Sequence, residues 1–86
     1  MKREELLKMV KEDGLNLCYV MNQDKEICLT AVKQNGCALK YVENQDVEIC
    51  LEAVKKNIKA IEYIKDKRIL NEILIYLSFL KENNLI

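Results

Sequence analysis

Residues 24–35, DKEICLTAVKQN, carry the clearest hydrophobic pattern in the chain. The apolar positions are Ile27, Cys28, Ala31 and Val32. Their spacing places them on one face of an α-helix. Asp24 is a favourable N-cap, and Asn35 followed by Gly36 is a typical helix end. The pattern therefore predicts a helix of about 11 residues that stops at a glycine expected to adopt the left-handed conformation.

A shorter apolar pattern follows in residues 36–42, GCALKYV. Ala38, Leu39 and Val42 lie at helical spacing, which predicts a second helix of about seven residues. The next residues, VENQD, form a polar stretch typical of a turn. One unit is thus expected to contain a long helix, a tight corner, a short helix and a turn.

This unit occurs twice in succession. Gly14 to Asn35 aligns with Gly36 to Asn57 without a gap, and 15 of the 22 positions are identical. Weaker matches on both sides extend the pattern over the rest of the chain. The sequence therefore predicts one domain, residues 1–86. Its parts are a half repeat (1–13), a repeat (14–35), a second repeat (36–57) and a divergent C-terminal repeat (58–86).

A single helix pair of this size cannot bury its apolar face, whereas stacked pairs use their neighbours as core. The predicted fold class is all-α, a small solenoid-like stack of helix pairs with a 22-residue repeat. Tyr19, Tyr41 and Tyr63 recur at the same interval and are expected to form a column. That column either packs between layers or serves as a recognition surface, since tyrosine is favoured at interfaces.

The repeat also carries a family resemblance. ALKYV, a polar turn with aspartate, and then EICLEAVKKN resemble the short helical repeat catalogued as domain of unknown function 4116. AVKQNG earlier in the chain fits the same pattern, and the resemblance covers roughly residues 3–64. It implies a repetitive helical fold found in bacteria and viruses, and it supplies no catalytic residues. Residues 65–86 depart from the pattern.

Charge and hydropathy indicate which partners and which cellular compartment to expect. The 86 residues include 14 basic and 14 acidic side chains, and this balance argues against a general nucleic-acid binder. The first residues are charged, unlike a signal peptide. The most apolar stretch, residues 73–80, is far shorter than the roughly 20 residues that span a bilayer. A cytoplasmic protein of a bacterial or host cell, with no membrane partner and with reduced cysteines, is expected.

The cysteines and the absence of histidine indicate which metal and catalytic sites can be expected. Cys28 and Cys50 occupy a position that holds Leu6 in the first copy and Leu70 in the last, which indicates packing. No cysteine pair has C-x-x-C spacing, so a zinc site built from the four cysteines is only a weak alternative. Without histidine the usual general base is lacking. We expect no enzyme activity, no cofactor and no metal.

Basic residues gather late in the chain. Residues 1–54 hold seven basic and ten acidic side chains, whereas residues 55–86 hold seven basic and four acidic. The candidate basic patch consists of Lys55, Lys56, Lys59, Lys65, Lys67 and Arg68. It is either a solvated face or a binding site for an acidic protein or nucleic acid. Only Tyr63 lies within this segment, so stacking on single-stranded bases is poorly supported.

The last helix is apolar on more than one side. Its inner face is predicted to consist of Ile69, Leu70, Ile73, Leu74 and Leu77. Its second apolar face consists of Ile75, Tyr76, Phe79 and Leu80. A terminal repeat normally has a polar outer side. Either both faces are buried inside the stack, or the second face binds protein, most simply as a homodimer through this helix.

The predicted function is therefore non-catalytic binding of another protein, by an adaptor or a small inhibitor. Because the resembling family has viral members, one version is a phage-encoded inhibitor of a bacterial defence protein. The alternative is a nucleic-acid-associated protein that uses the basic cluster at residues 55–68.

Overall fold

The computed structural model describes residues 1–84, and these form helices and turns with no strand. Four α-helices alternate with three short 3-10 helices. The last two residues of the predicted unit 58–86 lie outside the described residues. The elements are α1 (Arg3–Glu12), η1 (Gly14–Tyr19), α2 (Lys25–Gln34), η2 (Gly36–Tyr41), α3 (Val47–Lys56), η3 (Ile58–Tyr63) and α4 (Lys67–Glu82).

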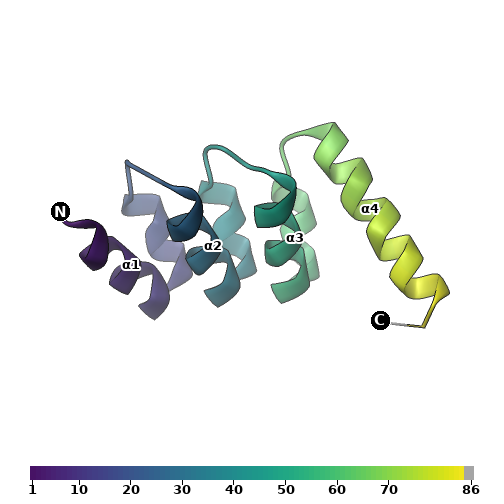
Figure 1. Ribbon diagram of the computed structural model, residues 1–86, viewed down its shortest axis with the longest axis horizontal. Coiled ribbons are helices and arrows are strands. Elements are labelled where there is room, and N and C mark those ends of the chain that lie inside the picture. Colours follow the sequence, from purple (N-terminus) through teal and green to yellow (C-terminus); the bar gives the residue numbers. More distant parts are fainter. Residues whose placement is uncertain (85–86) are drawn as a thin grey trace.

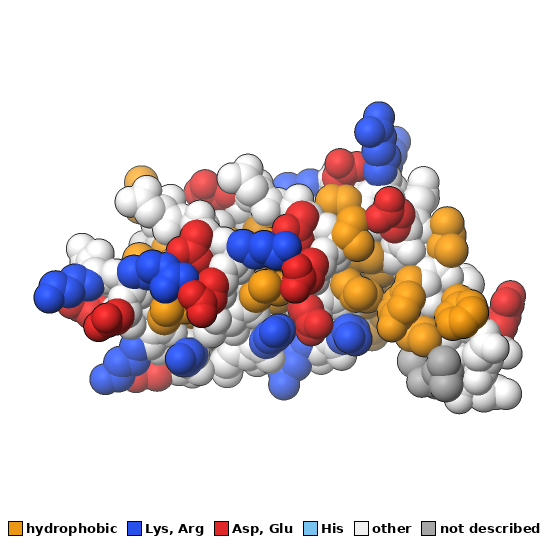
Figure 2. All heavy atoms as spheres, viewed as in Figure 1, with side chains coloured by type: hydrophobic (Ala, Val, Ile, Leu, Met, Phe, Trp, Pro, Cys, Tyr) orange, Lys and Arg blue, Asp and Glu red, His pale blue; other side chains and the backbone are white. Residues whose placement is uncertain are grey.

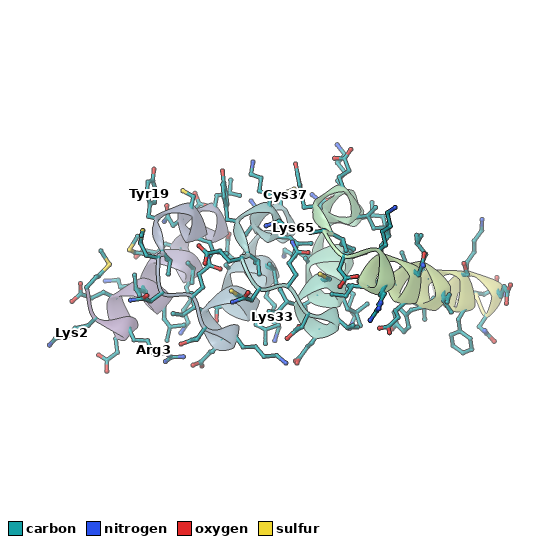
Figure 3. The ribbon with its side chains drawn as sticks, turned by 90° about the horizontal axis from the view of Figure 1, so that it is seen from above. Lys2, Arg3, Tyr19, Lys33, Cys37 and Lys65 are labelled. Atoms are coloured by element: carbon teal, nitrogen blue, oxygen red, sulfur yellow. The ribbon has the colours of Figure 1, made fainter. Side chains whose placement is uncertain are left out.

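The elements are arranged in two layers. α1, α2 and α3 lie side by side, and η1, η2 and η3 form a parallel row behind them (Figure 1). Seen from above, Tyr19 and Cys37 lie on the η side, whereas Arg3 and Lys33 lie on the α side (Figure 3). The molecule is elongated, 45 × 22 × 17 Å, with α1 at one end and α4 at the other.

The core lies between the two layers and repeats with the sequence. Among the described residues, every buried residue is either apolar or a glycine. Equivalent positions of α2 and α3 are buried alike, whereas Ala38 of η2 is buried and the equivalent Asn16 of η1 is half-buried. The α-helical pairs are Ile27 and Ile49, Cys28 and Cys50, Ala31 and Ala53, and Val32 and Val54. The cysteines thus pack as small apolar groups, as the leucines at equivalent positions indicated.

Side-chain caps mark where each element after α1 begins. The Asp24 and Asp46 carboxylates accept hydrogen bonds from the backbone N–H groups of Ile27 and Ile49, at 2.9 and 2.8 Å. Asn35 and Asn57 accept in the same way from the N–H groups two residues later and start the 3-10 helices. The predicted short helix is therefore a six-residue 3-10 helix, a form that suits such short segments.

The two glycines have a different role from the predicted one. Neither has a positive φ, so the expected left-handed helix end is wrong. A Cβ atom on Gly14 would lie 2.3 Å from the backbone oxygen of Ala31, and one on Gly36 would lie 2.3 Å from that of Ala53. Glycine is required at these two positions because η1 and η2 start against the backbone of α2 and α3 respectively.

Glutamine side chains link successive units. Gln45 donates to the backbone oxygen of Tyr63 at 2.8 Å and accepts from the backbone N–H of Lys65 at 2.9 Å. Gln23 bonds in the same way to Tyr41 and Glu43, at 2.8 and 3.0 Å. Each amide thereby satisfies backbone groups in the turn of the following unit, where the short helix has ended.

Replacing Gln45 with alanine should lower the free energy of unfolding by about 2 kcal/mol, because two backbone groups lose their partner in a half-buried turn. Urea denaturation followed by circular dichroism measures the change. Asn44→Ala is the matched control, since Asn44 is exposed and forms no side-chain hydrogen bond within residues 1–84. Equal stability of the two variants would contradict a linking role for Gln45.

Ion pairs follow the α layer. Arg3 bonds to Asp24 at 2.7 Å and to Glu26, and Lys25 bonds to Asp46 at 3.3 Å and Glu48 at 2.7 Å. Figure 2 shows the resulting alternation of basic and acidic side chains. The Arg3 guanidinium lowers the pKa of Asp24 through this hydrogen bond. All of these side chains are exposed, so each pair adds little to stability.

The glycine contact and the ion pairs change between α3 and α4, whereas the Gln45 link to the turn before α4 is kept. Ile58 stands where the earlier units have glycine, and Val47 stands where they have Arg3 or Lys25. The turn before α4 has Lys65 at the position that Gln23 and Gln45 hold in the turns before α2 and α3, so the glutamine that would bond to a further unit is replaced. With a side chain on residue 58, α4 cannot approach η3 as α2 and α3 approach η1 and η2. It leans away from the stack and packs on α3 (Figure 1).

Within residues 1–84, no helix is both long enough and apolar enough to cross a bilayer.

Candidate functional site

The inner side of α4 holds the helix on the stack. Ile73 is fully buried, at 1% exposure, and Ile69 and Leu77 are half-buried against the same core. These residues are four apart, so they form one stripe toward α3. The prediction of an inner apolar face is confirmed for this stripe. Leu74, which was assigned to the inner face, is instead 43% exposed because it lies about 100° around the helix from Ile73.

The opposite side of α4 is also apolar and remains uncovered. Ile75 is 70% exposed, Phe79 56% and Tyr76 36%. With Leu74 they form the apolar surface of α4, which Figure 2 shows at the C-terminal end of the molecule. Leu80, predicted to belong to this surface, is half-buried. A shallow hollow on the outer side is lined by Asn71, Leu74, Ile75, Ser78, Phe79 and Glu82.

The predicted basic patch is divided in space. Lys55 and Lys56 lie in the last turn of α3, and Lys59 follows them in η3. Lys65, Lys67 and Arg68 lie in the turn before α4 and in its first turn; α3 ends at the edge of the stack opposite to where α4 begins (Figure 1). The six side chains therefore form two groups, and Lys55 also pairs with Glu52 at 3.8 Å.

The tyrosine column is uneven. Tyr41 and Tyr63 are half-buried against the core, whereas Tyr19 is 72% exposed. The Lys40 ammonium lies 5.1 Å from the Tyr41 ring centre and 5.9 Å from that of Tyr63, within the range of a cation–π contact. Two of the three rings thus pack between neighbouring units, with a lysine bridging them.

A second group of exposed apolar side chains, which the sequence reasoning missed, lies at the α1 end. Met1, Tyr19 and Met21 are 82%, 72% and 85% exposed. They line a shallow hollow together with Leu6 and Asn22. The signal was present in the repeat, because Met21 stands where the next unit has the charged Glu43. These side chains come from separate segments, unlike the single helical face of α4.

The cysteines differ in environment. Cys28 and Cys50 are 4% and 0% exposed, and burial raises the pKa of each thiol to about 11. Cys18 is exposed and Cys37 half-buried. Among the described residues, no three or more cysteine, aspartate or glutamate side chains are grouped so as to hold a metal ion.

In the folded protein at pH 8, Ellman's reagent should label Cys18 quickly and reach Cys28 and Cys50 only after unfolding. Neutral buried thiols favour the folded state below the ordinary thiol pKa of 9.0, and this contribution is lost as the pH rises toward about 11. The wild type should therefore lose stability over pH 9–11 relative to a Cys28→Val, Cys50→Val variant. Parallel pH profiles for the two proteins would contradict the burial effect.

Comparison with known proteins adds a family match. The model for the family described as domain of unknown function (DUF4116) matches residues 2–45 and again residues 24–70. No curated protein and no solved structure matches the chain. The matched segment includes all three 3-10 helices and ends in the first turn of α4, so the whole apolar surface of α4 lies beyond it.

Proposed function

The chain belongs to the family described as domain of unknown function (DUF4116), and we propose that it is a non-catalytic protein-binding module. Its binding surface is the apolar surface of α4, and its partner is a second copy of the chain. The rest of the molecule acts as a short solenoid-like stack that holds this helix in place. Such a protein serves as an adaptor or a small inhibitor, which holds its target without changing it.

One observation carries the proposal: α4 buries one apolar stripe and leaves another open. Leu74, Ile75 and Phe79 are 43%, 70% and 56% exposed on a single 16-residue helix. Large contiguous apolar surfaces on soluble proteins mark interaction sites, because covering them removes apolar area from water.

A second copy is the partner that this arrangement favours. The two ends of the stack are different, since α1 lies at one and α4 at the other. A contact between two identical α4 surfaces closes on itself, whereas a contact between unlike ends would continue into a filament. Lys65 in place of the linking glutamine also removes the amide that would reach a further unit beyond α4.

The variant Ile75→Glu, Phe79→Glu tests the proposal. Both side chains are exposed, so the charges should leave helicity unchanged and weaken self-association by about 100-fold or more. Sedimentation equilibrium measures association, and circular dichroism measures folding. Met21→Glu, at an 85% exposed position near the other end, is the matched control.

Two outcomes would contradict the proposed partner. One is a wild-type protein that stays monomeric at millimolar concentration. The other is self-association that the double variant leaves intact.

The alternative function is binding of nucleic acid, which can be distinguished by its dependence on salt. Affinity for a DNA duplex should fall steeply with salt, since bound lysines release counterions. The two basic groups lie at opposite edges of the stack, so neutralising one of them should weaken binding more than neutralising the other. The groups are Lys55, Lys56 and Lys59, and Lys65, Lys67 and Arg68. No binding at low salt would exclude this alternative.

A further inference from the structure

We infer that two copies of the chain pair through α4 in an antiparallel arrangement, with a two-fold axis at Ile75 and with Arg68 of each copy facing Glu82 of the other. The inference rests on the proposed self-association and adds the orientation, the register and the charged groups that fix them. It follows from the placement of three residues along the outer side of α4.

Arg68, Ile75 and Glu82 are each seven residues apart. Seven residues are nearly two helical turns, so the three positions lie along one line with a drift of about 20° per step. Ile75 is two residues after the buried Ile73, which turns it by about 200° and places this line opposite α3. The line therefore runs along the uncovered side of the helix, and its midpoint is the most exposed apolar side chain of α4.

The two ends of this line carry opposite charges. Arg68 and Glu82 are exposed, and neither forms an ion pair with any residue in the range 1–84. Lys67 and Lys81 lie roughly 100° away from the line around the helix. The outer side of α4 is thus basic at the helix N-terminus and acidic at the C-terminus, and between them the apolar Ile75 and Phe79 lie beside the polar Asn71, Glu72 and Ser78.

This charge order decides the orientation. Parallel helices in register would set Arg68 against Arg68 of the second copy, and Glu82 against Glu82, and like charges repel. Antiparallel helices that cross at Ile75 set each arginine against a glutamate, since both lie about 10 Å from the axis along the helix. The helix dipoles then also oppose each other, which is favourable.

The same axis brings the apolar side chains together. A two-fold rotation about residue 75 places Ile75 beside Ile75 of the second copy, with Leu74 next to Leu74 on one side of the contact and Tyr76 next to Tyr76 on the other. Ser78 and Asn71 lie near the line in the shallow hollow of the outer side. Their small size allows the helix axes to approach to about 8–10 Å.

The size of this contact sets its strength. A 16-residue helix is about 24 Å long, and one helix pair covers less than the roughly 800 Å² per partner of a standard interface. The dimer should therefore be weak, with a dissociation constant of roughly 10 µM or higher, and it should weaken further in salt because the charged pairs are exposed.

Charge reversal in the full chain tests the inference. Arg68→Glu alone and Glu82→Arg alone should each weaken self-association by about tenfold, because each change sets like charges together at two places in the dimer. The double variant Arg68→Glu, Glu82→Arg should recover to within about threefold of the wild type. Lys81→Glu, one residue from Glu82 but off the line, is the matched control and should change association by less than about threefold.

Disulfide capture provides the second measurement. In a Cys18→Ser, Cys37→Ser background, Ile75→Cys should cross-link to itself on oxidation, because the axis brings the two positions together. Glu82→Cys should not, since two such positions would lie about 20 Å apart. It should instead cross-link to Arg68→Cys when the two variants are mixed.

The outcomes separate the two proposals. A monomeric wild type would overturn both the self-association and its geometry. A dimer whose double charge variant shows no recovery, or in which Glu82→Cys links to itself, would overturn the antiparallel arrangement and leave the proposed binding surface standing.

Discussion

Replacing Gly36 with alanine is expected to lower the free energy of unfolding by about 3 kcal/mol, because the added methyl group meets a backbone atom. The Cβ would lie 2.3 Å from the carbonyl oxygen of Ala53 and 3.1 Å from the Asn57 Cβ. No rotamer change can relieve a contact with backbone, so η2 and α3 must move apart. Small domains are stable by only about 5–15 kcal/mol, and this loss is therefore large.

The third unit provides the control for this variant. Ile58 occupies the position equivalent to Gly36 and is 58% exposed. Ile58→Ala should change stability by less than about 0.5 kcal/mol, since it removes exposed atoms and creates no close contact. Chemical denaturation of both variants measures the difference. A Gly36→Ala protein as stable as Ile58→Ala would show that the glycine is not required for the close packing of the layers.

Replacing Ile73 with alanine should cost about 3 kcal/mol, because this side chain is 1% exposed and its removal leaves a cavity between α4 and α3. The loss should weaken the attachment of α4 more than the rest of the stack, since Ile73 is the only fully buried residue of that helix. Hydrogen exchange should therefore speed up in α4 before it does in α2 and α3.

Ile75→Ala is the matched control, two residues away on the opposite side of the same helix. At 70% exposure it should leave the stability of the monomer within about 0.5 kcal/mol of the wild type. If α4 pairs through its outer side, this variant should weaken association instead. A large loss of monomer stability in Ile75→Ala, with none in Ile73→Ala, would mean that the two faces of α4 have been assigned the wrong way round.

Part of the candidate site was accessible from the sequence. The excess of apolar residues on the last helix was visible as Ile75, Tyr76 and Phe79 beyond the inner stripe. Which face Leu74 and Leu80 belong to could not be predicted from the sequence. A residue at the edge of an apolar stripe is buried or exposed according to the angle at which the helix crosses its neighbour. That angle is not the one that α2 and α3 repeat, since α4 leans away from the stack and packs on α3.

The basic cluster shows the same limit. Lys55 to Arg68 are close in sequence, and a linear pattern cannot show that the chain reverses direction between them. In the structure α3 runs one way and η3 runs back, so the cluster is divided between opposite edges. Basic residues that are close in sequence are therefore close in space only within each of the two groups.

The sequence by itself determined the local elements: the 22-residue repetition, the aspartate caps and the positions of the core residues in α2 and α3. These depend on interactions within a few residues, which periodicity and side-chain chemistry record directly. Only the tertiary structure decided why Gly14 and Gly36 are glycines, how glutamines link the units and why α4 leaves the stack. These features depend on distances between segments about 20 residues apart, which are set when the layers pack against each other.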